Sequence, residues 1–410
     1  MLASARMRRL LAAAACFLTS STIVTTAAAA PPADAPVPVH AGPCAGVQEA
    51  TGTRADTRPI PDQLLRRCLK LNQIQVIGTH NSYKQPVTPE VLSLLRLFDP
   101  ELAASIEYDH ATLAEQFSEQ EVRQIELDVF ADSQGGRYAG RLGLDLAGVP
   151  DAAPPPELLE PGFKVLHVQD LDFNSSCLNF VACLQQVDDW SDAHPAHLPV
   201  TILVELKDEA IRDPLGVGFV VPEPIGPEQL DALDAEIRSV FDEDEMITPD
   251  DVRAGHPTLQ DAVLAGGWPT LRESAGKVLF LMDNGDADRD AYRLGRPSLE
   301  GRVLFTNATP GDADAAFVKV NQPLGNVDRI QDLVAAGYVV RTRADEPTVQ
   351  ARTGDTTQRD AAFASGAQWV STDYPVPGSS PFSDYHAAIP DGDPARCNPV
   401  NTGPRCRPVG

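Results

Sequence analysis

Short apolar segments, separated by stretches long enough for a helix, recur through this sequence and limit its possible folds more than any other feature. The stretches 227–242 and 355–365 between them have helix-like composition. Alternating strands and helices predict a parallel sheet whose strands are buried on both faces. The candidate strands, mostly β-branched or aromatic, are 74–78, 124–130, 164–168, 200–206, 277–282, 302–306, 317–320, 337–341 and 367–371.

The intervals between polar residues at the ends of these segments favour a closed barrel. His80 and Glu126 are 46 residues apart, Asp128 and His167 are 39 apart, and His167 and Glu205 are 38 apart. A (β/α)₈ barrel uses about 30 or more residues for each strand and helix. We therefore predict an α/β fold with a TIM-type (β/α)₈ barrel, regular or distorted, over residues 70–385, with one polar cluster for each consecutive strand.

Nine candidate strands are one more than this barrel needs. We expect either 302–306 or 317–320 to be a loop or an added ribbon. Residues 213–227 are rich in Pro and Gly and predict a surface excursion. An open doubly wound sheet is the alternative, but no GxGxxG turn follows the first strand, which weakens a dinucleotide-binding interpretation.

The two ends of the chain are predicted to lie outside the barrel. Arg6, Arg8 and Arg9 precede an apolar stretch that ends in small residues at 27–30, as in a secretory signal peptide. We expect residues 1–30 to be removed and the protein to be secreted. Residues 31–69 predict a Pro- and Ala-rich extension, and residues 386–410 a loop-like tail. No later segment has about 18 uninterrupted apolar residues, so no transmembrane segment is expected.

The charge and the cysteines exclude several classes of function. The formal net charge is −25, and the first thirty residues contain three arginines and no acids. So acidic a chain is not expected to bind nucleic acid. Six cysteines remain after residue 30, and an even number in an exported chain favours disulfides over a zinc site or a catalytic thiol. Their clustering predicts three local pairs, Cys44–Cys68, Cys177–Cys183 and Cys397–Cys406.

Carboxylates gather on two of the predicted strands. In QIELDVF, residues 124–130, Glu126 and Asp128 point to the same face because side chains alternate along a strand. Two like charges on a buried face are costly unless a cation holds them, and oxygen ligands suit Ca²⁺ or Mg²⁺. Glu205 can add a third carboxylate from VTILVEL, residues 200–206. Lys207 on the same face can neutralise a phosphate or pair with these acids.

His80 and His167 each end a different apolar segment. Two histidines across a pocket are suited to general acid–base chemistry near neutral pH. A histidine in a structural role is the alternative for either one alone. Serine catalysis fits poorly because no GxSxG elbow is present, and zinc fits poorly because HExxH is absent. The remaining set of histidines, carboxylates and Asn81 around a hard cation suits phosphoryl transfer.

The ordered motifs HNSY, IELD, VLH and VELK resemble the catalytic half of calcium-dependent phosphoinositide-specific phospholipase C. The later stretches GWPTL, GKVLFLMD and WVSTDYP resemble the secreted bacterial branch of that family. The resemblance covers residues 70–376. It implies that Asn81, Glu126, Asp128 and Glu205 coordinate Ca²⁺ and that His80 and His167 flank the scissile phosphate.

The resemblance also implies a reaction in which the inositol 2-hydroxyl attacks phosphorus, forming a cyclic phosphate and releasing diacylglycerol. Glu126 would take the hydroxyl proton, His80 would stabilise the phosphorane, and His167 would protonate the leaving oxygen. Arg341 and Arg343 are candidates for substrate phosphate contacts or for structural roles. Asp373, which ends the last strand, is a candidate for orienting its neighbours. The expected partner is a phosphoinositide at a membrane or micelle surface, and we expect a monomer.

Two other functions are compatible with these motifs. A glycerophosphodiester phosphodiesterase has a similar barrel, but that family typically places Arg-Gly after its first histidine, where this chain has Asn81 and Ser82. An inactive barrel retained for binding is the second alternative. The presence of both histidines and every candidate ligand argues against it.

Overall fold

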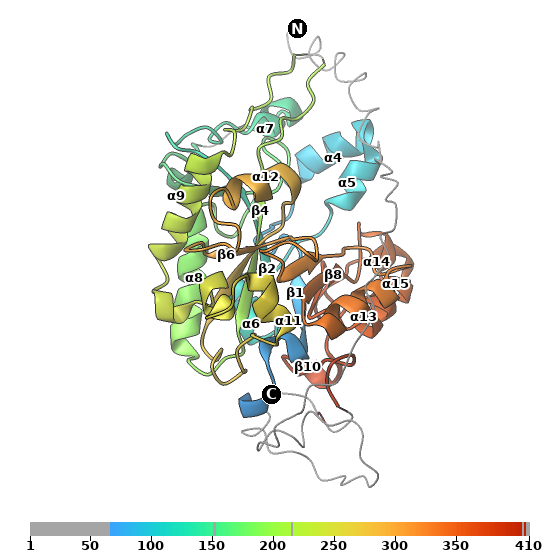
Figure 1. Ribbon diagram of the computed structural model, residues 1–410. Helices are drawn as coiled ribbons and strands as arrows, with labels where there is room; N and C mark the ends of the chain where they lie inside the picture. The colour runs from blue at the N-terminus through green and yellow to red at the C-terminus, as the bar shows by residue number, and fades with distance from the viewer. Residues whose placement is uncertain (1–65, 151–152, 215, 404–405, 407–410) are drawn as a thin grey trace.

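The computed structural model describes residues 66–150, 153–214, 216–403 and 406. In these residues eight parallel strands form a nearly closed barrel surrounded by helices (Figure 1). The predicted (β/α)₈ barrel is therefore confirmed. Its strands are β1 (Ile74–Thr79), β2 (Gln124–Phe130), β4 (Val200–Leu206), β5 (Val278–Met282), β6 (Leu304–Thr306), β7 (Phe317–Lys319), β8 (Val339–Arg343) and β9 (Trp369–Thr372).

The strand order around the barrel is β6-β5-β4-β2-β1-β9-β8-β7, and all pairings on this path are parallel. Between β6 and β7 the barrel is closed by one isolated parallel bridge, Asn307 to Phe317. There the Ala308 amide donates to the Phe317 carbonyl at 3.0 Å. All eight strands thus direct their carboxyl ends to the same mouth, where functional residues gather in barrels of this type.

The apolar segment 164–168 is the one that does not join the parallel barrel. Its strand, β3 (Lys164–Val165), runs antiparallel to the end of β2, with Val129 opposite Val165. Both β6 and β7 belong to the barrel, so the expectation that 302–306 or 317–320 is a loop was wrong. The prediction of one polar cluster for each consecutive barrel strand was also wrong at His167, because His167 follows this added antiparallel strand. Apolar composition marks burial, but it does not record the direction in which a strand pairs.

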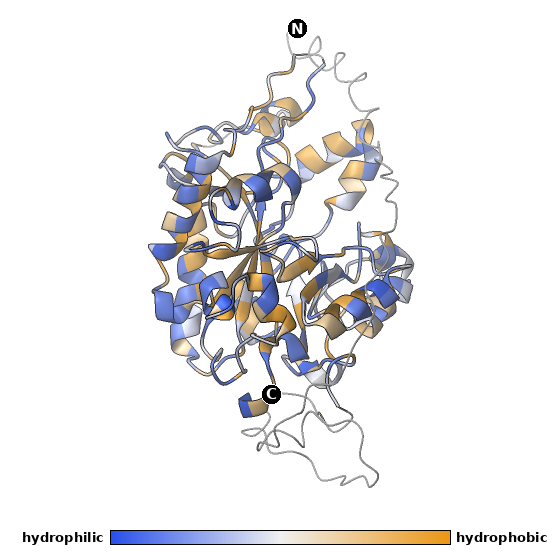
Figure 2. Cartoon of the chain, in the orientation of Figure 1, coloured by the Kyte–Doolittle hydropathy of each residue, from blue (hydrophilic) through white to orange (hydrophobic). Residues whose placement is uncertain are grey.

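The helices form the outer layer of the barrel. Figure 2 shows hydrophobic residues along the central strands and both hydrophobic and hydrophilic stretches on the surrounding helices. The predicted helices 227–242 and 355–365 correspond to α9 (Pro227–Arg238) and α15 (Thr357–Ser365). The α-helices are α4 (Pro89–Phe98), α5 (Pro100–Ser105), α6 (Leu113–Ser118), α7 (Leu142–Ala147), α8 (Phe180–Ala193), α9 (Pro227–Arg238), α10 (Pro249–Arg253), α11 (Leu259–Leu264), α12 (Asp286–Tyr292), α13 (Val327–Ala336), α14 (Val349–Thr353) and α15 (Thr357–Ser365).

The longest of these helices, α8, shows how the sequence determines packing. Phe180, Cys183, Leu184 and Val187 follow the spacing of one helical face, and all four are buried. The Asn179 side chain caps the first turn by accepting a hydrogen bond from the Ala182 amide at 3.3 Å. The predicted surface excursion 213–227 contains no helix or strand at its described positions up to 226, and its last residue, Pro227, begins α9. The described residues also include four short 3₁₀ helices: η1 (Leu71–Gln73), η2 (Pro156–Leu158), η3 (Glu243–Glu245) and η4 (Pro390–Gly392).

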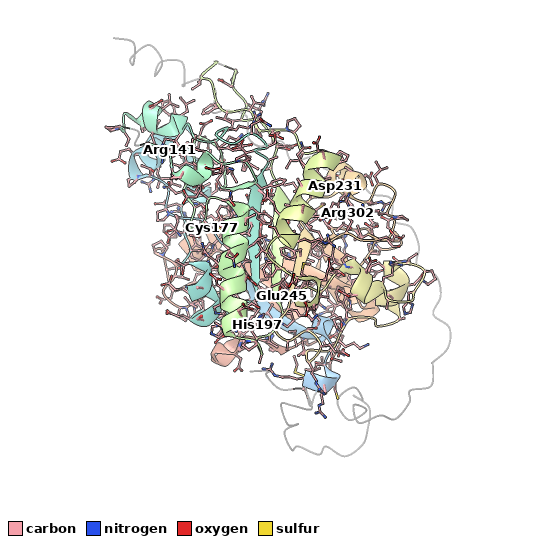
Figure 3. All side chains as sticks on the ribbon, turned by 90° about the vertical axis from the view of Figure 1, so that its left-hand side faces the viewer. Arg141, Cys177, His197, Asp231, Glu245 and Arg302 are labelled. Carbon is pink, nitrogen blue, oxygen red and sulfur yellow. A yellow bond between two sulfur atoms is a disulfide. The ribbon has the colours of Figure 1, made fainter. Side chains whose placement is uncertain are left out.

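Two of the predicted disulfides are confirmed, Cys177–Cys183 and Cys397–Cys406. Figure 3 places Cys177 near one end of α8 and His197 near the other. Cys68 is also disulfide-bonded, but its predicted partner, Cys44, lies outside the described residues. In the tail, β10 (Arg396–Cys397) pairs antiparallel with the beginning of β1, at the end of the barrel opposite the mouth.

The predicted signal peptide, and all of the N-terminal extension except residues 66–69, lie outside the described residues. Within the part of the chain that the structure describes, none of the helices has the length and apolarity needed to cross a membrane.

Candidate active site

The first strand ends at the mouth in a tight turn that carries His80 and Asn81. Asn81 has a φ of 49°, in the left-handed region that asparagine tolerates better than most residues. Ser82 then ties this turn to β2, because its amide donates to the Glu126 carbonyl at 2.9 Å and its Oγ accepts from the Glu126 amide at 2.8 Å. The sequence HNSY therefore fastens the turn that carries His80 and Asn81 to the strand that carries Glu126 and Asp128.

Gly78 allows the same two strands to approach closely. Gly78 is paired with Gln124 across β1 and β2, and a Cβ on Gly78 would overlap the Gln124 side chain. Glycine inside a strand commonly marks such a close approach. A larger residue at this position would have to displace the buried Gln124 side chain.

Three carboxylates from two neighbouring strands lie together at the mouth. Asp128 on β2 is directly opposite Glu205 on β4, and Glu126 points to the same face as Asp128. An oxygen from each of Glu126, Asp128 and Glu205 lies within 4.8 Å of the other two. The structure thus brings together the three acids that the alternation pattern selected.

These residues fit a hard cation. The Oδ1 atoms of Asn81 and Asp128 are buried without a hydrogen-bond partner in the structure, which is costly unless another group binds them. Burial raises the pKa of Glu126 to about 7 and raises that of Asp128 well above its ordinary value. A cation would keep both carboxylates ionised, and a site made only of oxygen ligands suits Ca²⁺.

Two positively charged side chains contact the three carboxylates. Lys207 Nζ lies 3.3 Å from Asp128 Oδ2 and 3.1 Å from Glu205 Oε1, while an Arg341 guanidinium nitrogen contacts Glu126 Oε2. Burial opposes the charge of Lys207, but the two neighbouring carboxylates raise its pKa above the ordinary value. Of the two roles considered for Lys207, the structure shows the ion pair with the acids.

His80 is held by a carboxylate on one side and faces the acidic cluster on the other. Its Nδ1 lies 2.9 Å from Asp373 Oδ1, and its Nε2 lies 3.9 Å from Glu126 Oε1. Arg343 pairs with Asp373 at 3.4 Å. Burial, followed by the charges of Arg343 and Arg341, lowers the pKa of His80 well below its ordinary value. Burial and these charges therefore favour the neutral imidazole in the absence of substrate.

His167 reaches the mouth from the loop after β3. Its Nδ1 lies 2.8 Å from Asp172 Oδ2, and this same oxygen lies 3.2 Å from Lys84 Nζ. The side chains of Lys84 and Asp172 are fully buried. The Val168 amide closes the loop by donating to the Asp172 carbonyl at 3.0 Å. Each of the two histidines thus has an aspartate at Nδ1, which leaves its Nε2 for other groups.

Several residues of the mouth were not predicted from the sequence. Asp283 follows β5 and Lys319 ends β7, and the two form an ion pair. Their positions at strand ends are a signal that could have identified them. Tyr108, Asp172 and Lys84 lie in loops, where the alternation of a strand gives no guidance.

One comparison with known proteins covers most of the chain. The family model for "Phosphoinositide phospholipase C, Ca2+-dependent" matches residues 69–399. No curated protein matches the chain.

Two solved structures of bacterial phospholipases are similar to the chain. One is a calcium-dependent phosphoinositol-specific phospholipase C from Pseudomonas sp., with 16% identity, a TM-score of 0.49 and coverage of 84% of this chain and 100% of that one. The other is a calcium-dependent phosphatidylinositol-specific phospholipase C from Streptomyces antibioticus, with 19% identity, a TM-score of 0.45 and coverage of 75% and 95% respectively. Because the family model spans most of its length, the chain belongs to the calcium-dependent phosphoinositide phospholipase C family, and it is an enzyme with Ca²⁺ as its cofactor.

Proposed function

We propose that this enzyme cleaves phosphatidylinositol into diacylglycerol and a cyclic inositol phosphate. The observation that carries the proposal is the pair of histidines at one barrel mouth, each with an aspartate at Nδ1, beside the carboxylates of Glu126, Asp128 and Glu205. The inositol 2-hydroxyl oxygen forms a bond to phosphorus as the bond from phosphorus to the diacylglycerol oxygen breaks.

In this proposal Asn81, Glu126, Asp128 and Glu205 hold the calcium ion. The buried unpaired Oδ1 atoms of Asn81 and Asp128 support the assignment. When bound, the ion supplies positive charge that lowers the pKa of a hydroxyl and offsets the charge of the phosphodiester. Lys207 and Arg341 reduce repulsion among the acids through the contacts described above.

The proton transfers are assigned to three side chains. Glu126, which the bound cation would keep ionised, accepts the proton of the 2-hydroxyl. The anionic phosphodiester favours the charged form of His80, which donates from Nε2 to the phosphoryl oxygens while Asp373 stabilises the imidazolium. His167 donates its proton to the departing diacylglycerol oxygen, and Asp172 holds the ring in the required orientation.

The charges around the mouth favour a head group without further phosphates. The nearby cations each pair with an acid, in the contacts Lys207–Asp128, Lys319–Asp283, Arg341–Glu126 and Arg343–Asp373. Breaking a buried ion pair to bind an extra phosphate would leave an unpaired carboxylate, which is costly. We therefore assign Arg341 and Arg343 to positioning Glu126 and Asp373, and we expect phosphatidylinositol to be preferred over its polyphosphorylated forms.

We also propose that the protein is secreted, and that it is a monomer. The disulfides Cys177–Cys183 and Cys397–Cys406 suit an oxidising compartment, and the signal-like residues 1–30 suit secretion. Culture medium and cell lysate, compared with an antibody to the folded domain, should contain the protein mainly in the medium. Retention in the lysate would contradict secretion.

The test of the reaction is cleavage of phosphatidylinositol vesicles with and without EGTA, followed by identification of the phosphorus-containing product. Cyclic inositol phosphate should form with calcium and stop forming when EGTA is added. Glycerophosphoinositol, a deacylated diester, serves as the competing substrate. Release of glycerol phosphate from it, with phosphatidylinositol left intact, would instead support a glycerophosphodiester phosphodiesterase.

A further inference from the structure

We propose that Tyr108 is a positioning residue that turns the side-chain oxygen of Asn81 toward the calcium ion. The inference rests on the proposed role of Asn81 as a ligand. Tyr108 lies far along the chain from the first motif, in the loop between α5 and α6, yet its hydroxyl reaches both residues that follow β1.

The contact between the two side chains determines which amide atom is free. Asn81 Nδ2 donates to Tyr108 Oη at 2.8 Å, and Asn81 Oδ1 is buried without a hydrogen-bond partner. The nitrogen and oxygen of a carboxamide point in different directions from the same carbon. Anchoring the nitrogen at Tyr108 therefore directs the oxygen elsewhere.

The turn sets the backbone of Asn81, but it does not set the rotation of the side-chain amide. The backbone of Asn81 is set by its φ of 49° and by the Lys84 amide, which donates to the Asn81 carbonyl at 2.8 Å. The terminal torsion of an asparagine is broad, and neighbouring contacts must choose between its two amide orientations. Without an anchor the amide nitrogen would be drawn to the carboxylates, the orientation that cannot bind a cation.

Tyr108 is itself held firmly enough to serve as that anchor. It is 5% exposed, and Lys84 Nζ donates to its carbonyl at 3.0 Å and lies 4.9 Å from the centre of its ring. The ring also stacks on His80 at 5.8 Å between centroids, with Oη 3.1 Å from His80 Nδ1. A second role follows, because the same hydroxyl links the calcium ligand Asn81 to the proposed catalytic His80.

The first experiment measures calcium binding to the Tyr108→Phe protein by calorimetry, without substrate. This change removes one hydroxyl and keeps the ring. We expect calcium affinity to fall about 10-fold or more, the range for losing a partner of a metal ligand. Tyr292→Phe is the matched control, since Tyr292 is also buried and its hydroxyl donates at 2.6 Å to Asp234, a residue of α9. That variant should bind calcium like the unaltered protein.

The second experiment repeats the change in an Asn81→Ala background. If Tyr108 acts through the Asn81 amide, Tyr108→Phe should then cost less than about 2-fold in calcium affinity, because the effects of residues that act together are not additive. An equal loss in both backgrounds would overturn the inference, as would unchanged affinity in Tyr108→Phe alone.

These binding results are separate from the proposed reaction. Cleavage of phosphatidylinositol by the unaltered protein, with unchanged calcium binding in Tyr108→Phe, would reject the role of Tyr108 and keep the reaction. Calcium binding that depends on Tyr108, in a protein that leaves phosphatidylinositol intact, would reject the reaction and keep the role of Tyr108.

Discussion

At the scale of single residues, the site depends on pairs in which one side chain holds another in a fixed orientation. Asp373 orients His80, Asp172 orients His167, and Tyr108 is proposed to orient Asn81. A neutral imidazole can adopt either tautomer, and a carboxylate at Nδ1 selects the one that carries its proton on Nδ1 and leaves Nε2 for the substrate. The histidines therefore contribute little to the reaction if their partners are removed.

Replacing either histidine tests the proposed proton transfers. His80→Ala and His167→Ala should each lower the turnover of phosphatidylinositol by at least about 10²-fold, the lower range for removing an acid–base group. His256→Ala is the control, because His256 follows α10 and lies away from the strand ends of the mouth. Near-normal turnover in either of the first two variants would remove that histidine from the mechanism.

Replacing Asp172 tests its effect on His167, measured through kcat. Asp172→Asn keeps the shape but loses the charge, so kcat should fall about 10²-fold while KM changes little, because substrate binding does not use this group. Asp189→Asn, on the exposed side of α8, should leave kcat unchanged. A change in KM without a change in kcat would place Asp172 in substrate binding instead.

At the scale of elements, β3 and α8 form a unit that delivers His167 to the mouth. The Cys177–Cys183 disulfide follows the loop that carries His167 and Asp172, and it joins that loop to the first turn of α8. Because β3 is only two residues long, this crosslink and the pairing with β2 hold the loop in place.

Removing this disulfide should affect both stability and turnover. Closing so short a loop is worth about 2 kcal/mol in the free energy of unfolding. Urea unfolding of the Cys177→Ser/Cys183→Ser protein should show that loss. Its kcat, measured on phosphatidylinositol, should also be lower. Cys397→Ser/Cys406→Ser should lose similar stability and keep its kcat, since that disulfide lies at the opposite end of the barrel. Equal kcat in both variants would mean that the crosslink does not position the loop.

The helix α9 contains a carboxylate that should make stability depend on pH. Glu236 Oε1 accepts from the Phe163 amide at 3.1 Å, Oε2 is buried without a partner, and burial raises the pKa of Glu236 to about 6. The folded protein thus holds this proton more tightly than the unfolded chain. The associated stability is full below the unfolded pKa of about 4.3 and is lost as pH rises through about 6.

Glu236→Gln should remove that pH dependence. By linkage the loss amounts to roughly 1 to 2 kcal/mol in the free energy of unfolding between pH 4 and 7. The variant should therefore gain stability relative to the unaltered protein as pH rises, measured by urea unfolding at several pH values. Glu228→Gln, an exposed residue on the same helix, is the control. Parallel stability curves for the Glu236→Gln and unaltered proteins would contradict the assignment.

At the scale of the whole molecule, the barrel places repelling charges from separate strands in one mouth. The chain has a net charge of −25, and three of its carboxylates converge between β2 and β4. The folded state is therefore expected to bind calcium more tightly than the unfolded chain, in which these acids are dispersed.

Calcium should raise the melting temperature for this reason. At a free calcium concentration 100-fold above its dissociation constant, the folded state gains about 2.7 kcal/mol. Melting followed by circular dichroism with calcium and with EGTA measures the difference. Asp128→Asn should reduce the calcium-dependent shift, whereas Asp189→Asn should preserve it. An equal shift in both variants would place the ion elsewhere.

The amino-acid sequence by itself determined the alternation of strand and helix, the parity that puts Glu126 and Asp128 on one face, and the polar ends of the strands. These are local properties, because the period of a strand is set by its backbone. Only the tertiary structure decided that the segment at 164–165 pairs antiparallel and that Tyr108 and Lys84 reach the first motif. Those contacts join residues distant in the chain, and their geometry depends on how the barrel closes and where its loops return.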